Sequence, residues 1–158
     1  MNRQIGTVIL ASITIIIVIA TLAPFLPVRE QRFSELGVLG PNQTIKGYPT
    51  SVVVNQSFLL YGLVGNHEGN VENYQLVVKL GNQTTIVTNT TYATAPVMAT
   101  YWHILRENET WLFPMNLSVN HVGNNTRIIF ELWSYHIPTS GFKYTGVWNH
   151  IWLNVTSS

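Results

Sequence analysis

The most repeated chemical signal in this sequence is the tripeptide Asn-x-Ser/Thr, whose asparagine amide can accept an N-linked glycan. The chain has 158 residues, 15 of them asparagine, and chance would place about two or three of these in such a tripeptide. Eight asparagines occupy one, which predicts a glycoprotein: Asn42, Asn55, Asn82, Asn89, Asn108, Asn116, Asn124 and Asn154. The alternative is that Asn and Thr are frequent because they suit turns and strands. If glycans are attached, each of these side chains must point away from the core.

Other reactive groups are sparse. The chain lacks cysteine, which excludes disulfides, thiol chemistry and cysteine-ligated metals. No serine-nucleophile elbow, phosphate loop or carboxylate pair occurs, so we predict no enzyme activity, no cofactor and no metal. Two alternatives stay formally open: an acid–base pair of His67 with Glu68, and a copper site of His103 with Met98 or Met115. The five histidines do not follow metal-ligand spacing: His67, His103, His121, His136 and His150.

Charge is low throughout the chain. Only 9% of the residues are charged and the net charge is +1, which excludes an electrostatic case for nucleic-acid binding. All seven acidic residues are glutamate. A surface with few carboxylates changes its charge little as the pH falls. Together with the glycan signals and the lack of cysteine, this composition suggests an archaeal cell surface exposed to acid and heat.

An uncharged run at the N-terminus predicts a membrane anchor. The 22 residues from Ile5 to Leu26 carry no charge, and as a helix they would extend about 33 Å, enough to cross the hydrocarbon core. We predict an uncleaved transmembrane helix at 5–27 in contact with the lipid bilayer, after a cytoplasmic tip at 1–4. A signal peptide is the alternative, but its cleavage site near Ala23 would be followed by Pro24. Because all eight glycan signals follow the run, the domain at 31–158 is predicted to be extracellular.

The rest of the chain is typical of β-structure. Short runs rich in Val, Ile, Thr, Tyr and Trp alternate with Gly and Asn turns. This spacing predicts an antiparallel, immunoglobulin-like β-sandwich. Residues 93–107 are read as a loop. The expected strands lie near 33–39, 51–54, 57–65, 71–80, 83–92, 110–120, 126–136 and 144–156.

Alternation along these strands separates a core face from a solvent face, since successive side chains point to opposite sides. Along 111–119 every second residue is apolar, and Asn116 lies on the opposite face. The same parity places Asn154 outward in the last strand. It also turns four aromatic residues outward on the last two strands, which should pair. These four form a predicted partner-binding patch: Trp133, Tyr135, Trp148 and Trp152. Cross-strand pairing that stabilises the sheet, or burial under the 93–107 loop, is the alternative.

Several segments together resemble a known family. The stretches "FSELGVLGPN", "GYPTSVVV", "NHEG", "NETW" and "WNHIWLNV" are similar to the archaeal domain of unknown function numbered 1616, over about residues 33–156. The resemblance implies a membrane-anchored, extracytoplasmic protein with a sandwich fold, and it supplies no catalytic residues. Its matching positions, for which we expect a structural role, are Glu35, Asn66, His67, Glu68 and Trp111.

Three functions are compatible with these features. The first is a non-enzymatic glycosylated ectodomain that acts, with a protein partner, as an accessory or structural subunit of a membrane or cell-envelope complex. The second is a filament subunit of the pilin or archaellin type, although the expected basic residue before glycine is replaced by Ile5 before Gly6. The third is an auxiliary subunit of a membrane-bound enzyme complex.

Overall fold

The computed structural model describes residues 16, 21 and 31–157 of the chain. The chain divides into two units, Met1–Gln31 and Arg32–Ser158. In the first unit, Ile16 and Thr21 are helical. Among the described residues, no helix has the length and apolar character needed to cross a membrane. The predicted helix at 5–27 falls almost entirely outside the described residues.

The second unit is all-β. A short 3-10 turn, η2 (Ile137–Thr139), joins its last two strands. The strands of the described chain are β1 (Phe33–Leu39), β2 (Ser51–Val53), β3 (Phe58–His67), β4 (Glu72–Gly81), β5 (Val97–Leu105), β6 (Thr110–Leu117), β7 (Gly123–His136) and β8 (Gly141–Thr156).

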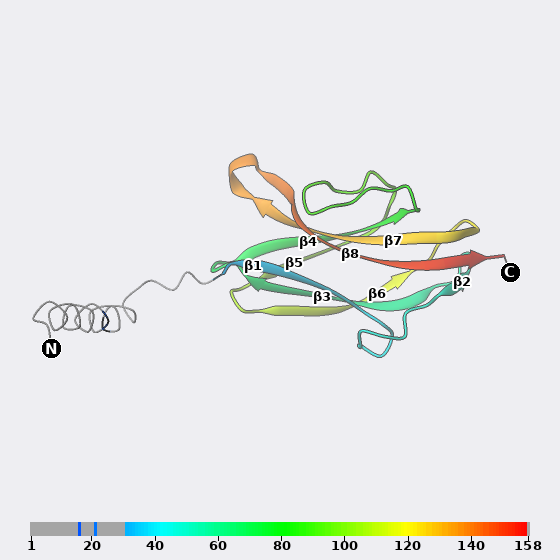
Figure 1. Cartoon of the computed structure of the whole chain (residues 1–158), viewed down its shortest axis with the longest axis horizontal. Helices are drawn as coiled ribbons and strands as arrows, with labels where there is room; N and C mark the ends of the chain where they lie inside the picture. Colours follow the sequence, from blue (N-terminus) through cyan, green and yellow to red (C-terminus); the bar gives the residue numbers. More distant parts are fainter. Residues whose placement is uncertain (1–15, 17–20, 22–30, 158) are drawn as a thin grey trace, which may run out of the picture. The chain divides into compact units, whose positions relative to one another are not determined.

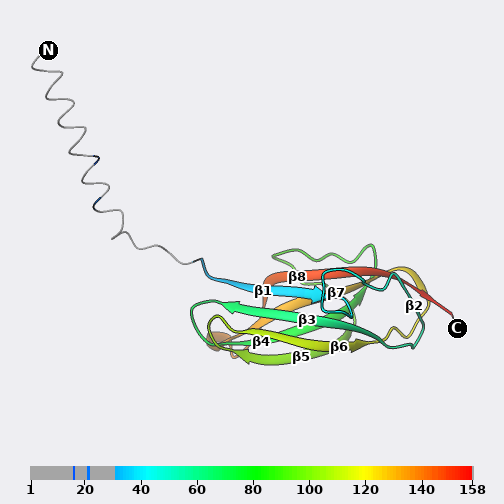
Figure 2. The ribbon, with the colours of Figure 1, turned by 90° about the horizontal axis from the view of Figure 1, so that it is seen from below.

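The strands form two sheets that pack face to face (Figure 1). One sheet has the order β1-β3-β6, and the other has the order β2-β8-β7-β4-β5. All ladders are antiparallel except the short parallel pair of β2 with β8. β5 and β6 lie on one side of the sandwich (Figure 2). This arrangement confirms the predicted sandwich, including the pairing of the last two strands.

The core lies between the sheets and follows the predicted alternation. Phe113, Met115 and Leu117 of β6 are buried, as are Ile128 and Phe130 of β7. Their neighbours on the other face of β6, Leu112, Pro114 and Asn116, are exposed. Since a slip of one residue would exchange the two faces of a strand, the predicted register of these strands is correct.

Two neighbouring segments exchange the roles predicted for them. Residues 83–92 are not a strand, and 97–105, read as part of a loop, is β5. Side-chain oxygens explain the first error. The Asn82 Oδ1 accepts the backbone N–H of Thr84 at 2.9 Å, and the Thr88 Oγ1 accepts those of Thr90 and Thr91. Such local bonds occupy the N–H groups that a strand ladder would use, so the segment turns although its residues favour strands.

Asn66 fixes the end of the sandwich where β3 turns into β4. It is fully buried, and its Nδ2 donates to the backbone oxygens of Asn70 and Leu105 at 2.7 and 3.0 Å. Its Oδ1 accepts the Glu68 N–H and the Tyr74 hydroxyl. Burial raises the pKa of Tyr74 to about 12, so this hydroxyl keeps its proton and can donate. The position matched by the family resemblance therefore has the structural role that was expected.

Replacing Asn66 by alanine should destabilise the domain by about 2–4 kcal/mol, because the buried carbonyl of Leu105, the partly buried carbonyl of Asn70 and the Glu68 N–H lose their partner. Urea unfolding of Asn66→Ala measures the loss. The matched control is Asn73→Ala on the outer face of β4, where a change within about 0.5 kcal/mol is expected. Equal effects at the two positions would contradict a structural role for the Asn66 amide.

Candidate functional site

The outer face of the five-stranded sheet holds buried charges and partly buried aromatic rings, which are unusual on the surface of a domain. Residues 82–96 form a loop that crosses this face, on the side away from the three-stranded sheet (Figure 1). Beneath the loop lies the one salt bridge of the described chain, between the Lys79 Nζ and the Glu131 Oε2 at 2.8 Å. Lys79 is 6% exposed and Glu131 is fully buried. Charges are rarely buried in this way unless they are paired and hydrogen-bonded.

The ion pair binds the loop through a single residue. The Lys79 Nζ donates to the backbone oxygen of Ala93 at 2.8 Å, and the Ala93 N–H donates to the Glu131 Oε1. Glu131 also accepts the Trp133 indole N–H at 3.3 Å. The two charges thus give Ala93 both a donor and an acceptor, as a neighbouring strand would.

Aromatic rings surround this ion pair. The Lys79 Nζ lies 5.0 Å from the ring centroid of Tyr92 and 5.6 Å from that of Trp133, within the range of a cation–π contact. Tyr92 contacts Trp133 and Tyr144. The Tyr144 hydroxyl donates to the backbone oxygen of Thr88 at 2.7 Å, and burial, with Glu131 nearby, raises its pKa to about 12. The phenol therefore stays protonated and holds the middle of the loop.

A second cation lies farther along the same face. The Arg127 guanidinium lies between the rings of Trp148 and Trp152, 5.4 and 5.3 Å from their centroids. Its Nη1 donates to the backbone oxygen of Thr85 at 2.9 Å, and its Nη2 lies 3.4 Å from the Nδ1 of His150. Burial, assisted by the positive charge of Arg127, lowers the pKa of His150. A neutral ring whose Nδ1 accepts a hydrogen bond from the Arg127 N–H fits this position.

The loop divides the predicted partner-binding patch. All four residues lie on the outer sheet face as parity predicts, but Trp133 and Trp148 are half-buried, and Trp148 packs against the small buried cluster that includes Ala93. Tyr135 and Trp152 are 39% and 41% exposed. Among the described residues, no ring contact joins Trp133 to Trp148. The four residues are therefore not one continuous open patch.

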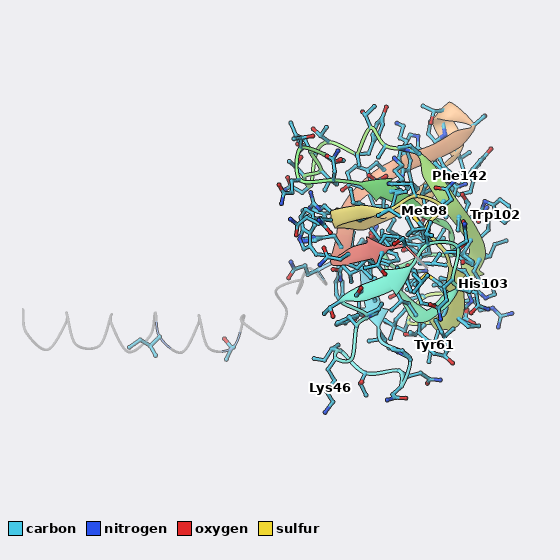
Figure 3. All side chains as sticks on the ribbon, turned by 90° about the vertical axis from the view of Figure 1, so that its right-hand side faces the viewer. Lys46, Tyr61, Met98, Trp102, His103 and Phe142 are labelled. Carbon is cyan, nitrogen blue, oxygen red and sulfur yellow. The ribbon has the colours of Figure 1, made fainter. Side chains whose placement is uncertain are left out.

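An exposed aromatic residue on β5 was missed. Trp102 pairs with Gln75, which on its other side pairs with Trp133, so the three residues share the outer face. Trp102 is 63% exposed and Ile104, on the same face, is 61% exposed. Figure 3 shows Trp102 and His103 projecting from one side of the sandwich. Treating 97–105 as a loop hid the strand, although its run of β-branched and aromatic residues is a strand signal.

All eight asparagines of the predicted glycan sites are exposed. For two of these asparagines, a hydrogen bond to the backbone shows which atom of the side-chain amide faces the protein. The Asn82 Oδ1 accepts the Thr84 N–H, and the Asn154 Oδ1 accepts the Asn125 N–H, each at 2.9 Å. Because a backbone N–H can only donate, the amide oxygen must face it. The amide nitrogen, to which a glycan would be joined, is thereby left free.

The histidines of the described residues do not lie together in a catalytic or metal-binding arrangement. His67 stacks on Phe33 and bonds to Asn108, whereas Glu68 accepts the Ser34 hydroxyl, so the proposed acid–base neighbours engage different partners. His103 stacks on Trp111 with centroids 4.8 Å apart. Within the described ranges, no group of three or more His, Cys, Asp or Glu side chains is placed to hold a metal ion.

Comparison with known proteins gives the family. The sequence profile of DUF1616, a domain of unknown function, matches residues 27–154. The chain belongs to this family. A comparison of the DUF1616 chain with curated proteins finds no match.

Solved structures resemble the DUF1616 domain in fold. The CARDB domain of the PF1109 protein from Pyrococcus furiosus is 12% identical with a TM-score of 0.50, over 80% of this chain and 90% of that one. A β-glucosidase from Listeria innocua is 11% identical with a TM-score of 0.47, and the match covers 78% of this chain but only 16% of the enzyme. Spo0M, a sporulation control protein from Bacillus subtilis, is 7% identical with a TM-score of 0.45, over 82% and 51%. At these identities the CARDB likeness supports the sandwich fold alone.

Replacing Lys79 by methionine should destabilise the DUF1616 domain by about 3–5 kcal/mol, because the buried Glu131 carboxylate loses its counter-charge. It should also release the loop, which hydrogen exchange of residues 86–93 measures. The exposed Lys143→Met is the matched control, with an expected change within about 0.5 kcal/mol. Unchanged protection of the loop in Lys79→Met would show that the ion pair does not hold it.

His150 should make the domain less stable in mild acid. Its pKa is lowered in the folded state, so below the unfolded value of about 6.5 the unfolded chain binds a proton that the folded chain does not. Stability should therefore fall as the pH drops from about 6.5 toward the folded pKa, and then cease to fall on this account. Urea unfolding across this range should show a smaller decline for His150→Gln than for the natural protein. Parallel declines would contradict this effect.

Proposed function

We propose that this protein is a heavily N-glycosylated, single-span membrane protein of an archaeal cell surface. In this proposal its sandwich is a non-enzymatic accessory or structural subunit of a membrane or envelope complex. The observation that carries the proposal is the placement of the glycan signals: eight asparagines far apart in the sequence are all exposed. Asn and Thr selected only for turns and strands would not need every such asparagine to be accessible.

The distribution of these asparagines supports an outside-facing domain. Asn116 lies on the outer face of the three-stranded sheet and Asn154 on that of the five-stranded sheet. Asn82 and Asn89 belong to the loop that crosses the latter face. Glycans at these positions would cover both faces of the sandwich. The uncharged run at 5–26 would supply the anchor that holds the domain at the bilayer.

A protein partner remains part of the proposal. Of the residues predicted to bind it, Tyr135 and Trp152 have side chains exposed enough to meet a partner directly. Trp133 and Trp148 would contribute indirectly, by supporting the loop and the rings beside them. Aromatic side chains at such positions commonly anchor interfaces because they bury a large area with few rotatable bonds.

Intact mass and glycopeptide mapping of the protein from its native type of host test the proposal. The mass should exceed the 17.8 kDa of the bare chain. Ser118→Ala should remove the glycan of Asn116, whereas Ser118→Thr, which keeps the signal, should retain it. Both variants should fold, since Ser118 is exposed. A mass equal to that of the bare chain would end the glycoprotein proposal.

N-terminal sequencing of the same material separates the anchor from its alternatives. An N-terminus at Met1 supports the anchored protein, and one at Thr7 supports a filament subunit of the pilin type. A soluble form that starts near residue 24 would identify a cleaved signal peptide and contradict the single-span proposal.

A further inference from the structure

The five-stranded sheet ends in an unprotected strand. β5 has one ladder neighbour, β4, and forms the last position of the sheet order. One row of its backbone N–H and C=O groups is therefore open for pairing. Proteins usually protect such an edge with charges, proline, a bulge or a very short strand. The sequence of β5, VMATYWHIL, contains no charged residue, no proline, no glycine and no glycan signal.

The strands at the other three ends of the two sheets, β6, β2 and β1, have protective features that β5 lacks. β6 carries Pro114 at its centre and Asn116 beside it. β2 has only three residues. β1 carries the exposed charged residue Glu35. β5 has a bulge only near its start, opposite Val78 and Lys79. From Ala99 to Leu105 its ladder with β4 is regular, so this segment is a straight template for another strand.

Exposed apolar side chains add a second reason for pairing. Trp102 and Ile104 share the outer face of β5, and each keeps more than 60% of its surface exposed. Val97 at the start of the strand is 58% exposed. Water does not favour leaving such groups open together. Figure 3 shows Trp102 projecting freely from the sandwich.

We propose that two copies of this chain pair antiparallel through β5 around a two-fold axis, joining their five-stranded sheets into one sheet of ten strands. A pairing centred on Trp102 places it opposite its own symmetry mate, Thr100 opposite Ile104, and Ala99 opposite Leu105. Each residue then meets a residue of the same sheet face, as an antiparallel ladder requires. The pairing spans the regular part of β5.

A second copy fits this edge because the strand is self-complementary. A two-fold interface brings identical patches together, and an uncharged strand brings no like charges into opposition. With an aromatic side chain presenting about 150–250 Å², the open side chains and backbone edges of two strands would bury on the order of 1,200 Å², the lower limit for a specific interface. Glycans at Asn108 and Asn116 would not block it, since Asn108 contacts His67 of β3 and Asn116 lies on the outer face of the other sheet.

The oligomeric state of the full chain in mild detergent tests the pairing. Sedimentation analysis should find a dimer for the natural protein. Trp102→Lys should weaken the dimer at least about tenfold, because it places two lysines directly opposite each other. Ile104→Lys should weaken it similarly, because it puts a charge in place of an apolar side chain that the pairing would bury. The matched control is Val71→Lys, at a position 61% exposed like Ile104 but in the β3–β4 turn, and it should remain a dimer. Unfolding curves of all three variants should match the natural protein, since the replaced side chains are mostly exposed.

Hydrogen exchange distinguishes strand pairing from contact through side chains alone. Amides of 97–105 should exchange about tenfold more slowly in the dimer than in Trp102→Lys, while those of 110–117 in β6 should not change. A monomeric natural protein, or a dimer that survives both β5 variants because the N-terminal segment holds it, would overturn the proposal. So would a dimer without protection of β5, or protection seen only when another protein co-purifies.

Discussion

The ion pair of Lys79 and Glu131 is the interaction on which the outer face of the five-stranded sheet depends. The loop above it has 15 residues and no strand of its own, a length that is uncommon without a specific function or support. Side chains of the sheet bind three of its carbonyls: Arg127 binds that of Thr85, Tyr144 that of Thr88, and Lys79 that of Ala93. Without disulfides, these bonds fix the path of the loop, and only at Ala93 do both backbone groups bond to the ion pair.

The path of the loop decides which surfaces stay open. It approaches β8 so closely that a Cβ on Gly146, whose φ is +85°, would lie 2.3 Å from the backbone oxygen of Asn89. Around this contact Trp133 and Trp148 become supports of the loop. The loop does not cover Trp102 and Ile104 of β5, which lie on the same sheet face and keep more than 60% of their surface exposed. The division of one aromatic face into a covered and an open part thus follows from where the ion pair holds the chain.

Sequence reasoning succeeded where a residue's environment depends on its own strand. Alternation predicted the apolar row of β6 and the outward direction of Asn116 and Asn154, because a buried face leaves only one register. It failed where the environment comes from a distant segment. Alternation places Lys79 and Glu131 on the outer faces of their strands, where a charged side chain is expected to meet solvent. Their burial depends on residues 82–96, part of which the sequence predicts as a strand. The β-branched residues of 83–92 favour extended structure, but the Asn82 and Thr88 side chains bind the nearby N–H groups first.

The exchange of roles between 83–92 and 97–105 also explains the asymmetry of the sandwich. A strand at 83–92 would have needed a neighbouring strand to bond its backbone groups. The open edge of the five-stranded sheet is where such a neighbour is available. Because its N–H groups are bound locally and its carbonyls by side chains of the sheet, the segment crosses the face instead. β5 therefore forms the edge of the sheet, although its uncharged sequence would suit a central strand better. The same bonds that cover one face of this domain therefore leave its edge exposed.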